Sequence, residues 1–200
     1  MLKKSWFFLT AHRDLYRAKL VFHLFLLSLS IFFAAGMLAY LTIRANAFRR
    51  PESIPYVTLQ IPVFFWVSTG FLFIVSLALH QAVSAIHRNR SPTFQRALII
   101  AAVAAFAFTG LQAFGLQELL NDHFKATDGS TKAYGMCFTM AFLHALHVIG
   151  GLAFLGFVIA QANQQRYDHE RHWTVDNCAS YWHFLDAVWV IMLVTFYIAR

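Results

Sequence analysis

Charged residues are scarce in this 200-residue sequence, and their scarcity excludes an ordinary soluble protein. Only 12% of the residues are charged, whereas 59% are hydrophobic, and the mean hydropathy is +0.55. One soluble core of this size could not bury so much apolar surface. A bilayer accommodates it, because a spanning helix needs about 20 mostly apolar residues. We therefore expect an integral membrane protein.

Cysteines and common metal-binding motifs are also scarce. Cys137 and Cys178 lie far apart and outside any C-x-x-C pair, so we expect two ordinary buried thiols. No H-E-x-x-H pair occurs, which removes the best-known helical zinc motif. The first residues carry too many charges for a cleavable signal peptide, so the first apolar run is expected to remain as a spanning helix.

Basic residues outnumber acidic ones, but their pattern is not typical of nucleic-acid binding. The formal net charge is +7, and the basic residues lie in short clusters between apolar runs. Such clusters favour contact with an anionic membrane surface. No nucleic-acid partner is therefore expected.

Five apolar runs predict an all-α bundle of five transmembrane helices that forms a single domain over residues 1–200. The segments between the runs are short, so successive helices should be antiparallel neighbours. Pro62 lies near the start of the second run, where its missing N–H costs least. The runs are Leu20–Ile43, Val57–Leu79, Ala97–Leu116, Tyr134–Ala160 and Ala179–Ala199.

Ionisable residues are costly at membrane depth, and four of them fall in the last two runs. FLHALHVIGG places His144 and His147 on one face of the fourth helix, and YWHFLDAVW places His183 and Asp186 on one face of the fifth. Residue counting puts His147 and Asp186 at depths about one turn apart, so a direct or water-mediated contact between them is expected. The predicted interhelical polar cluster comprises His144, His147, His183, Asp186, Trp182 and Trp189.

The residues alone leave three interpretations of this cluster open. Metal ligation is disfavoured because H-x-x-H supplies two ligands, whereas a closed site needs three or four. Haem ligation needs small residues beside the histidines. Gly150 and Gly151 meet this need, but they would also serve close helix packing, so they do not indicate a haem. A proton-conducting role is the second interpretation, and a polar packing network, which we favour, is the third. His23, near the start of the first run, can reach the interface and is expected to be structural.

The two quoted stretches resemble the last two helices of subunit III of the haem–copper respiratory oxidases. The family pattern has H-G-x-H-V and then W-H-F-x-D-x-x-W, and this chain has HALHV and WHFLDAVW. PVFFWVSTGFL and GLQAFG also resemble the short bacterial form of that subunit. The likeness covers nearly the whole chain and is strongest over residues 134–199.

The resemblance implies a five-helix, non-catalytic accessory subunit of a cytochrome c oxidase type of enzyme. Haems and copper would belong to the partner subunits I and II, and this chain would hold no redox centre, catalytic residue or metal. Its role would be to support O₂ reduction and proton pumping in aerobic respiration through assembly, stability, bound phospholipid and proton uptake. The expected location is the bacterial inner membrane.

Three departures from the family pattern limit what can be carried over. Ala145 replaces the glycine between the two histidines, and Leu29 stands where the family often has a glutamate. A proton role assigned to that glutamate therefore does not extend to this chain. We also expect the chain to lack the two N-terminal helices that wall a lipid-filled cleft in longer relatives.

Two other functions remain as alternatives. The small accessory subunit of nitric oxide reductases has a similar W-H-x-x-D-x-x-W block. A stand-alone di-histidine haem or metal membrane protein would also place paired histidines at membrane depth.

The distribution of Lys and Arg predicts the orientation of the chain. Ten of these residues fall on the side that holds the N-terminus and six on the other side, which indicates an inside N-terminus and an outside C-terminus. A reporter fused after Arg200 is therefore expected to face the outside, as activity assays of the fusion would show. A cytoplasmic reporter would contradict this orientation.

Overall fold

The fold is a set of five α-helices, seen in a computed structural model that describes residues 2–49, 60–88, 90–125, 131–164, 167 and 172–199. No strand occurs within these ranges. The predicted all-α class with five long apolar helices is confirmed. The helices are α1 (Leu2–Arg49), α2 (Val63–His87), α3 (Ser91–Lys125), α4 (Thr131–Asn163) and α5 (Trp173–Ile198).

Most helix ends extend beyond the predicted apolar runs, because backbone hydrogen bonding continues where side chains become polar. The start of the second span is the main exception, since residues 60–62 of the predicted run are not helical and α2 begins at Val63. Helix α2 begins directly after Pro62, whose missing N–H removes no helical hydrogen bond at that position. Residues 57–59 of the predicted second span lie outside the described residues. Helix α5 begins earlier than predicted, and Asp176 in its first turn suits the positive end of the helix dipole.

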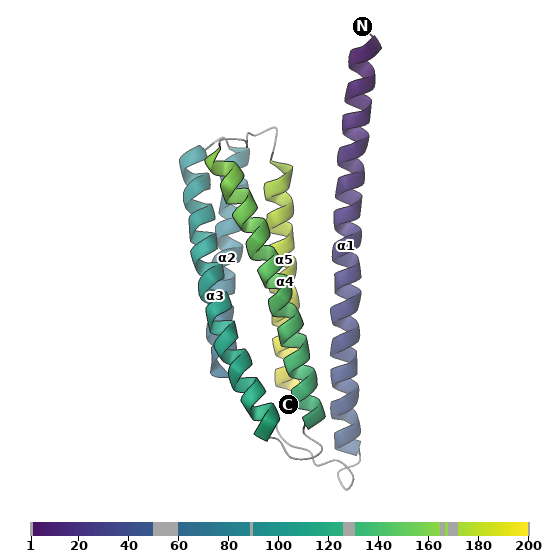
Figure 1. Ribbon diagram of the computed structural model, residues 1–200, viewed down its shortest axis with the longest axis vertical. Helices are drawn as coiled ribbons and strands as arrows, with labels where there is room; N and C mark the ends of the chain where they lie inside the picture. Colours follow the sequence, from purple (N-terminus) through teal and green to yellow (C-terminus); the bar gives the residue numbers. More distant parts are fainter. Residues whose placement is uncertain are drawn as a thin grey trace.

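Helices α2 to α5 run alternately up and down as a bundle, and α1 lies along one side of it (Figure 1). Helix α1 packs on α4 and α5, and its N-terminal part extends beyond the other helices (Figure 1). The ends of α2 and α4 therefore meet the starts of α3 and α5 at one end of the bundle. The side of the membrane on which this end lies stays a prediction.

Small residues bring α2 and α3 together along their length. Only residues 88–90 separate the two helices, and the Arg90 N–H donates to the Ala85 carbonyl at 2.9 Å. Alanines line the contact, because a small side chain lets two backbones approach closely in a membrane. The buried alanines are Ala78, Ala82, Ala85, Ala97, Ala101, Ala104 and Ala105.

Helix α1 is held by buried aromatic side chains and by one buried cation. Phe33 and Tyr40 are both fully buried, and the Tyr40 ring packs edge-on against Phe196 at 5.0 Å between centroids. Arg44 is 5% exposed, and its Nε–H donates to the Ala199 carbonyl at the end of α5. A cation at a helix C-terminus offsets the negative end of the dipole, so this contact stabilises the end of α5.

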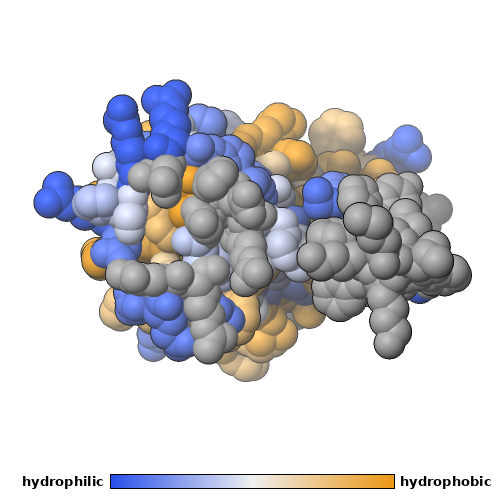
Figure 2. Space-filling model, turned by 90° about the horizontal axis from the view of Figure 1, so that it is seen from above, coloured by the Kyte–Doolittle hydropathy of each residue, from blue (hydrophilic) through white to orange (hydrophobic). Residues whose placement is uncertain are grey.

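The surface of the molecule has the distribution that a membrane requires. All five helices are long and apolar enough to span a bilayer, so this is a multi-pass membrane protein. Hydrophilic residues gather at the upper end of the bundle and hydrophobic residues lie on its flanks (Figure 2). Both predicted thiols, Cys137 and Cys178, are buried, which confirms that expectation.

Close packing of α4 on α5 depends on Gly151. A Cβ atom at this position would lie 3.2 Å from carbons of both Tyr181 and Trp182, tighter than normal contact. A Cβ atom at Gly150 would make an ordinary contact with the Tyr181 hydroxyl at 3.6 Å, and Gly156, five residues beyond Gly151, has open space at its Cβ position. The close approach of α4 to α5 is therefore confined to Gly151.

The substitution Gly151→Leu is expected to lower the thermal unfolding midpoint of the detergent-solubilised chain, because the larger side chain forces α4 and α5 apart. The loss should amount to about 1–3 kcal/mol, the usual range for overpacking. Gly156→Leu is the matched control and should be neutral or slightly stabilising, because leucine forms helix better than glycine. Equal destabilisation by both substitutions would contradict the close contact at Gly151.

Candidate functional site

His144 is buried at a point where α4 meets α1, α3 and α5. It is 1% exposed, and neither ring nitrogen has a hydrogen-bond partner among the described residues. Its ring centroid lies 6.2 Å from that of Phe33, 6.5 Å from Phe108 and 5.2 Å from Trp189. His144 is thus packed as an aromatic ring among other aromatic rings.

His147 lies one turn further along α4 and uses its polar atoms differently. Its Nδ1 lies 2.6 Å from the Leu143 carbonyl of the same helix, so this nitrogen carries the donated proton. Its ring lies 5.5 Å from that of Phe33, between centroids. The Tyr181 hydroxyl of α5 donates to the main-chain carbonyl of His147 at 3.0 Å. This hydrogen bond joins α5 to the main chain of α4 and does not involve the His147 side chain.

His183 and Asp186 lie at the contact between α5 and α2. Ser76 Oγ and His183 Nδ1 are 2.7 Å apart, which joins the two helices by a hydrogen bond. His80, about one turn beyond Ser76 on α2, lies beside His183. Both carboxylate oxygens of Asp186 are buried and outside hydrogen-bond geometry with any described residue, although Ser76 is adjacent.

The two pairs serve two different interfaces. Asp186 has no hydrogen-bond partner among the described residues, so the direct form of the predicted His147–Asp186 contact is not a hydrogen bond, and the water-mediated form stays a prediction. Depth along a helix does not set rotation about its axis. The α4 pair meets aromatic rings of α1 and α3 and, through Trp189, of α5, whereas the α5 pair meets Ser76 of α2.

The two predicted tryptophans both donate hydrogen bonds across helix contacts. The Trp182 indole N–H donates to the Gly151 carbonyl of α4 at 3.2 Å. The Trp189 indole N–H donates to Thr69 Oγ1 of α2 at 3.0 Å. Because α5 presents both indoles one heptad apart, they reach neighbouring helices from one face of α5.

Trp189 also leads into a buried polar network, which we call the Phe65 carbonyl network. Thr69 Oγ1 and Ser68 Oγ both donate to the Phe65 carbonyl, at 2.7 Å and 3.0 Å. Gln112 of α3 donates from Nε2 to Ser68 Oγ at 3.3 Å. Helices α2, α3 and α5 are thereby joined through one main-chain oxygen and the side chains around it.

The sequence interpretation did not assign a role to this network. Its residues occur in the stretches PVFFWVSTGFL and GLQAFG, which were notable only for their family resemblance. The available signal was the presence of Ser68, Thr69 and Gln112 in the middle of apolar runs. Uncharged polar residues at that depth usually satisfy one another across helices.

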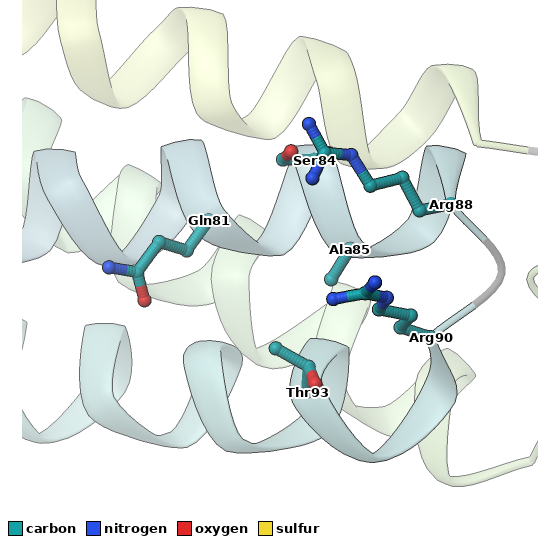
Figure 3. A pocket seen from close by; sticks show the side chains of 6 residues that line it. All are labelled: Gln81, Ser84, Ala85, Arg88, Arg90 and Thr93. Atoms are coloured by element: carbon teal, nitrogen blue, oxygen red, sulfur yellow. The ribbon is translucent and has the colours of Figure 1, made fainter.

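A polar hollow of about 180 Å³ lies where α2 turns into α3. Arg88 extends back along α2 towards Ser84, Arg90 extends towards Ala85, and Thr93 of α3 also lines the hollow (Figure 3). The two guanidinium groups give the hollow a positive charge.

A comparison with protein families decides the assignment. The model of the family described as cytochrome c oxidase subunit III matches residues 11–199. The chain belongs to this family. The match confirms the resemblance drawn from HALHV and WHFLDAVW, and it lends no support to the nitric oxide reductase or stand-alone haem alternatives.

Individual relatives agree with the family match. Proteins named cytochrome c oxidase subunit 3 are 28% identical over 179 residues in Synechocystis sp. and 29% over 176 residues in Thermostichus vulcanus. These matches cover 88% and 87% of this chain, and 72% and 83% of the relatives. The Pongo abelii protein of the same name is 31% identical over 145 residues, 72% of this chain and 52% of its own length. The chain thus spans about half the length of that relative.

The substitution Thr69→Val is expected to lower stability by about 1 kcal/mol, because it leaves the buried Trp189 N–H without an acceptor. The thermal unfolding midpoint in detergent measures this loss. Thr139→Val is a matched control, because Thr139 is exposed and its hydroxyl bonds only to the Gly135 carbonyl of its own helix. If the two substitutions have equal effects, the Trp189–Thr69 bond does not contribute as described.

Proposed function

We propose that this chain is the non-catalytic accessory subunit III of a haem–copper terminal oxidase of the cytochrome c oxidase type. It supports O₂ reduction and proton pumping in aerobic respiration without taking part in electron transfer. The observation that carries the proposal is the family match over residues 11–199. The haems and copper belong to the partner subunits I and II.

The packing of the polar residues supports an accessory role. His147, His183, Trp182 and Trp189 all use polar ring atoms in hydrogen bonds within or between helices. His144 is enclosed by three aromatic rings. These contacts favour a packing role over haem ligation, and the six predicted site residues are proposed to stabilise the bundle during turnover.

We further propose that the chain forms one domain in the bacterial inner membrane, with its N-terminus inside. Buried residues from all five helices form one continuous core, which supports a single domain. Likeness to the Synechocystis and Thermostichus proteins over most of the chain supports a bacterial membrane. The excess of basic residues at the N-terminal side supports the orientation.

Phospholipid is proposed as a further partner. The hollow near Arg88 and Arg90 lies at the end of two spanning helices, at the depth of a lipid headgroup. Arginine binds phosphate with geometric specificity, since its planar fork offers paired donors. The exposed apolar flanks below would contact the acyl chains.

The substitutions Asp186→Ala and His147→Leu are expected to shorten the lifetime of the oxidase during turnover several-fold while the initial rate changes little. The reason is that both side chains lie in helix contacts of an accessory subunit and not at a redox centre. The measurements are the yield of purified complex and the half-life of O₂ consumption. Unchanged yield and half-life in both variants would refute the stabilising role.

Purification of the native complex tests the proposed function directly. The chain should co-purify with a larger haem-bearing subunit, and a Soret band should belong to the complex and not to the isolated chain. Ile191→Ala, at a position of α5 that is 55% exposed, is the control for the two substitutions at helix contacts. A Soret band in the isolated chain would overturn the accessory assignment.

A further inference from the structure

Two histidines and one aspartate meet at the upper end of the bundle, away from the candidate site on α4 and α5. His87 is the last residue of α2, His172 directly precedes α5, and Asp176 lies in the first turn of α5. His172 and Asp176 are four residues apart, so the helix places them on one face. His87 reaches them from the neighbouring helix. We call these three residues the histidine–aspartate cluster.

The distances within this cluster are long for hydrogen bonds, but the ligand atoms lie close enough together to reach one ion. His87 Nε2 lies 3.5 Å from Asp176 Oδ1, and His172 Nε2 lies 3.5 Å from Asp176 Oδ2. Hydrogen bonds between nitrogen and oxygen are usually about 2.7–3.2 Å long. Ligand atoms about 2.0–2.1 Å from a tetrahedral zinc ion lie about 3.3 Å from one another. One ligand atom from each residue lies within 4.8 Å of the others.

The burial of one carboxylate oxygen points in the same direction as these distances. Asp176 Oδ1 is buried and has no hydrogen-bond partner among the described residues. A buried carboxylate oxygen is costly without a partner, and a bound cation would remove that cost. The side chains of His87, His172 and Asp176 are 45%, 30% and 36% exposed, so an ion can reach them from solvent. This exposure also leaves room for a water as fourth ligand.

The donor set indicates the class of ion. Two imidazole nitrogens and one carboxylate oxygen suit zinc and its neighbours among the divalent transition metals. Calcium and magnesium prefer oxygen ligands throughout. Arg88 follows His87 but extends back along α2 towards Ser84, where it lines the hollow between α2 and α3 (Figure 3).

We propose that His87, His172 and Asp176 form a binding site for a divalent transition metal ion of the zinc type. The ion joins the end of α2 to the start of α5, two segments that are far apart in the sequence. The competing explanation is an ion pair between the carboxylate and protonated imidazoles, which requires no metal. The metal site predicts stoichiometric binding of one ion per chain, whereas the ion pair predicts no such binding.

The test uses the full-length chain in detergent micelles, freed of metal with a chelator and then titrated with Zn²⁺ against a chromophoric competitor. We expect one tightly bound Zn²⁺ per chain. His87→Ala and Asp176→Asn should each weaken binding by more than about tenfold, because even supporting residues of metal sites contribute that much. Zn²⁺ should also raise the unfolding midpoint of the unchanged chain but not that of either variant.

His23→Ala is the matched control, because His23 is an exposed histidine whose Nδ1 bonds only within α1, to the Lys19 carbonyl at 2.7 Å. It should bind Zn²⁺ as the unchanged chain does. Circular dichroism verifies that each variant is helical, and the Co²⁺ absorption spectrum of the unchanged chain reports tetrahedral coordination without any substitution. Absence of stoichiometric binding, equal binding by all variants, or a Co²⁺ spectrum without tetrahedral bands would overturn the proposal. None of these outcomes depends on the oxidase assignment.

Discussion

The arrangement of α2 to α5 depends on the contacts of one indole, that of Trp189. Its ring packs edge-on against Phe65 at 5.1 Å and lies near Phe108 and His144, while its N–H donates to Thr69. In a membrane, lipid tails are as apolar as the helix surfaces, so burial of apolar area does not choose between helix arrangements. Shape and interhelical hydrogen bonds make that choice, and Trp189 supplies both at one point.

The rotation of α5 that Trp189 fixes also positions the remaining polar residues. Successive helical residues are rotated by about 100°, so Trp182 lies almost directly in line with Trp189 along the helix. Asp186 is rotated by about 60° from that line, which turns it towards α2. Ser76 then meets His183, and Trp182 meets Gly151 of α4. The rotation of α5, held by Trp189 together with Tyr181 and Trp182, thus accounts for the separation of the two pairs of ionisable residues.

The assignment to the subunit III family gives these contacts a purpose. In the role proposed above, such a subunit contributes to its complex through its shape and its persistence, and buried polar contacts between helices would provide both. The histidine–aspartate cluster lies at the end of α2 and the start of α5, where ionisable groups remain accessible to solvent. There a bound ion would fix the end of α2 to the start of α5, which contact with lipid does not do.

The sequence by itself determined the membrane class, the five helices, the family and the identity of the polar residues on α4 and α5. Apolar runs and local spacing such as HALHV carry that information because a bilayer imposes it on each helix separately. Only the tertiary structure decided that His144 meets aromatic rings while Asp186 faces α2, and that His87 meets Asp176. The rotation of each helix about its axis, and the meeting of distant helix ends, follow from contacts among several helices at once, which no local pattern encodes.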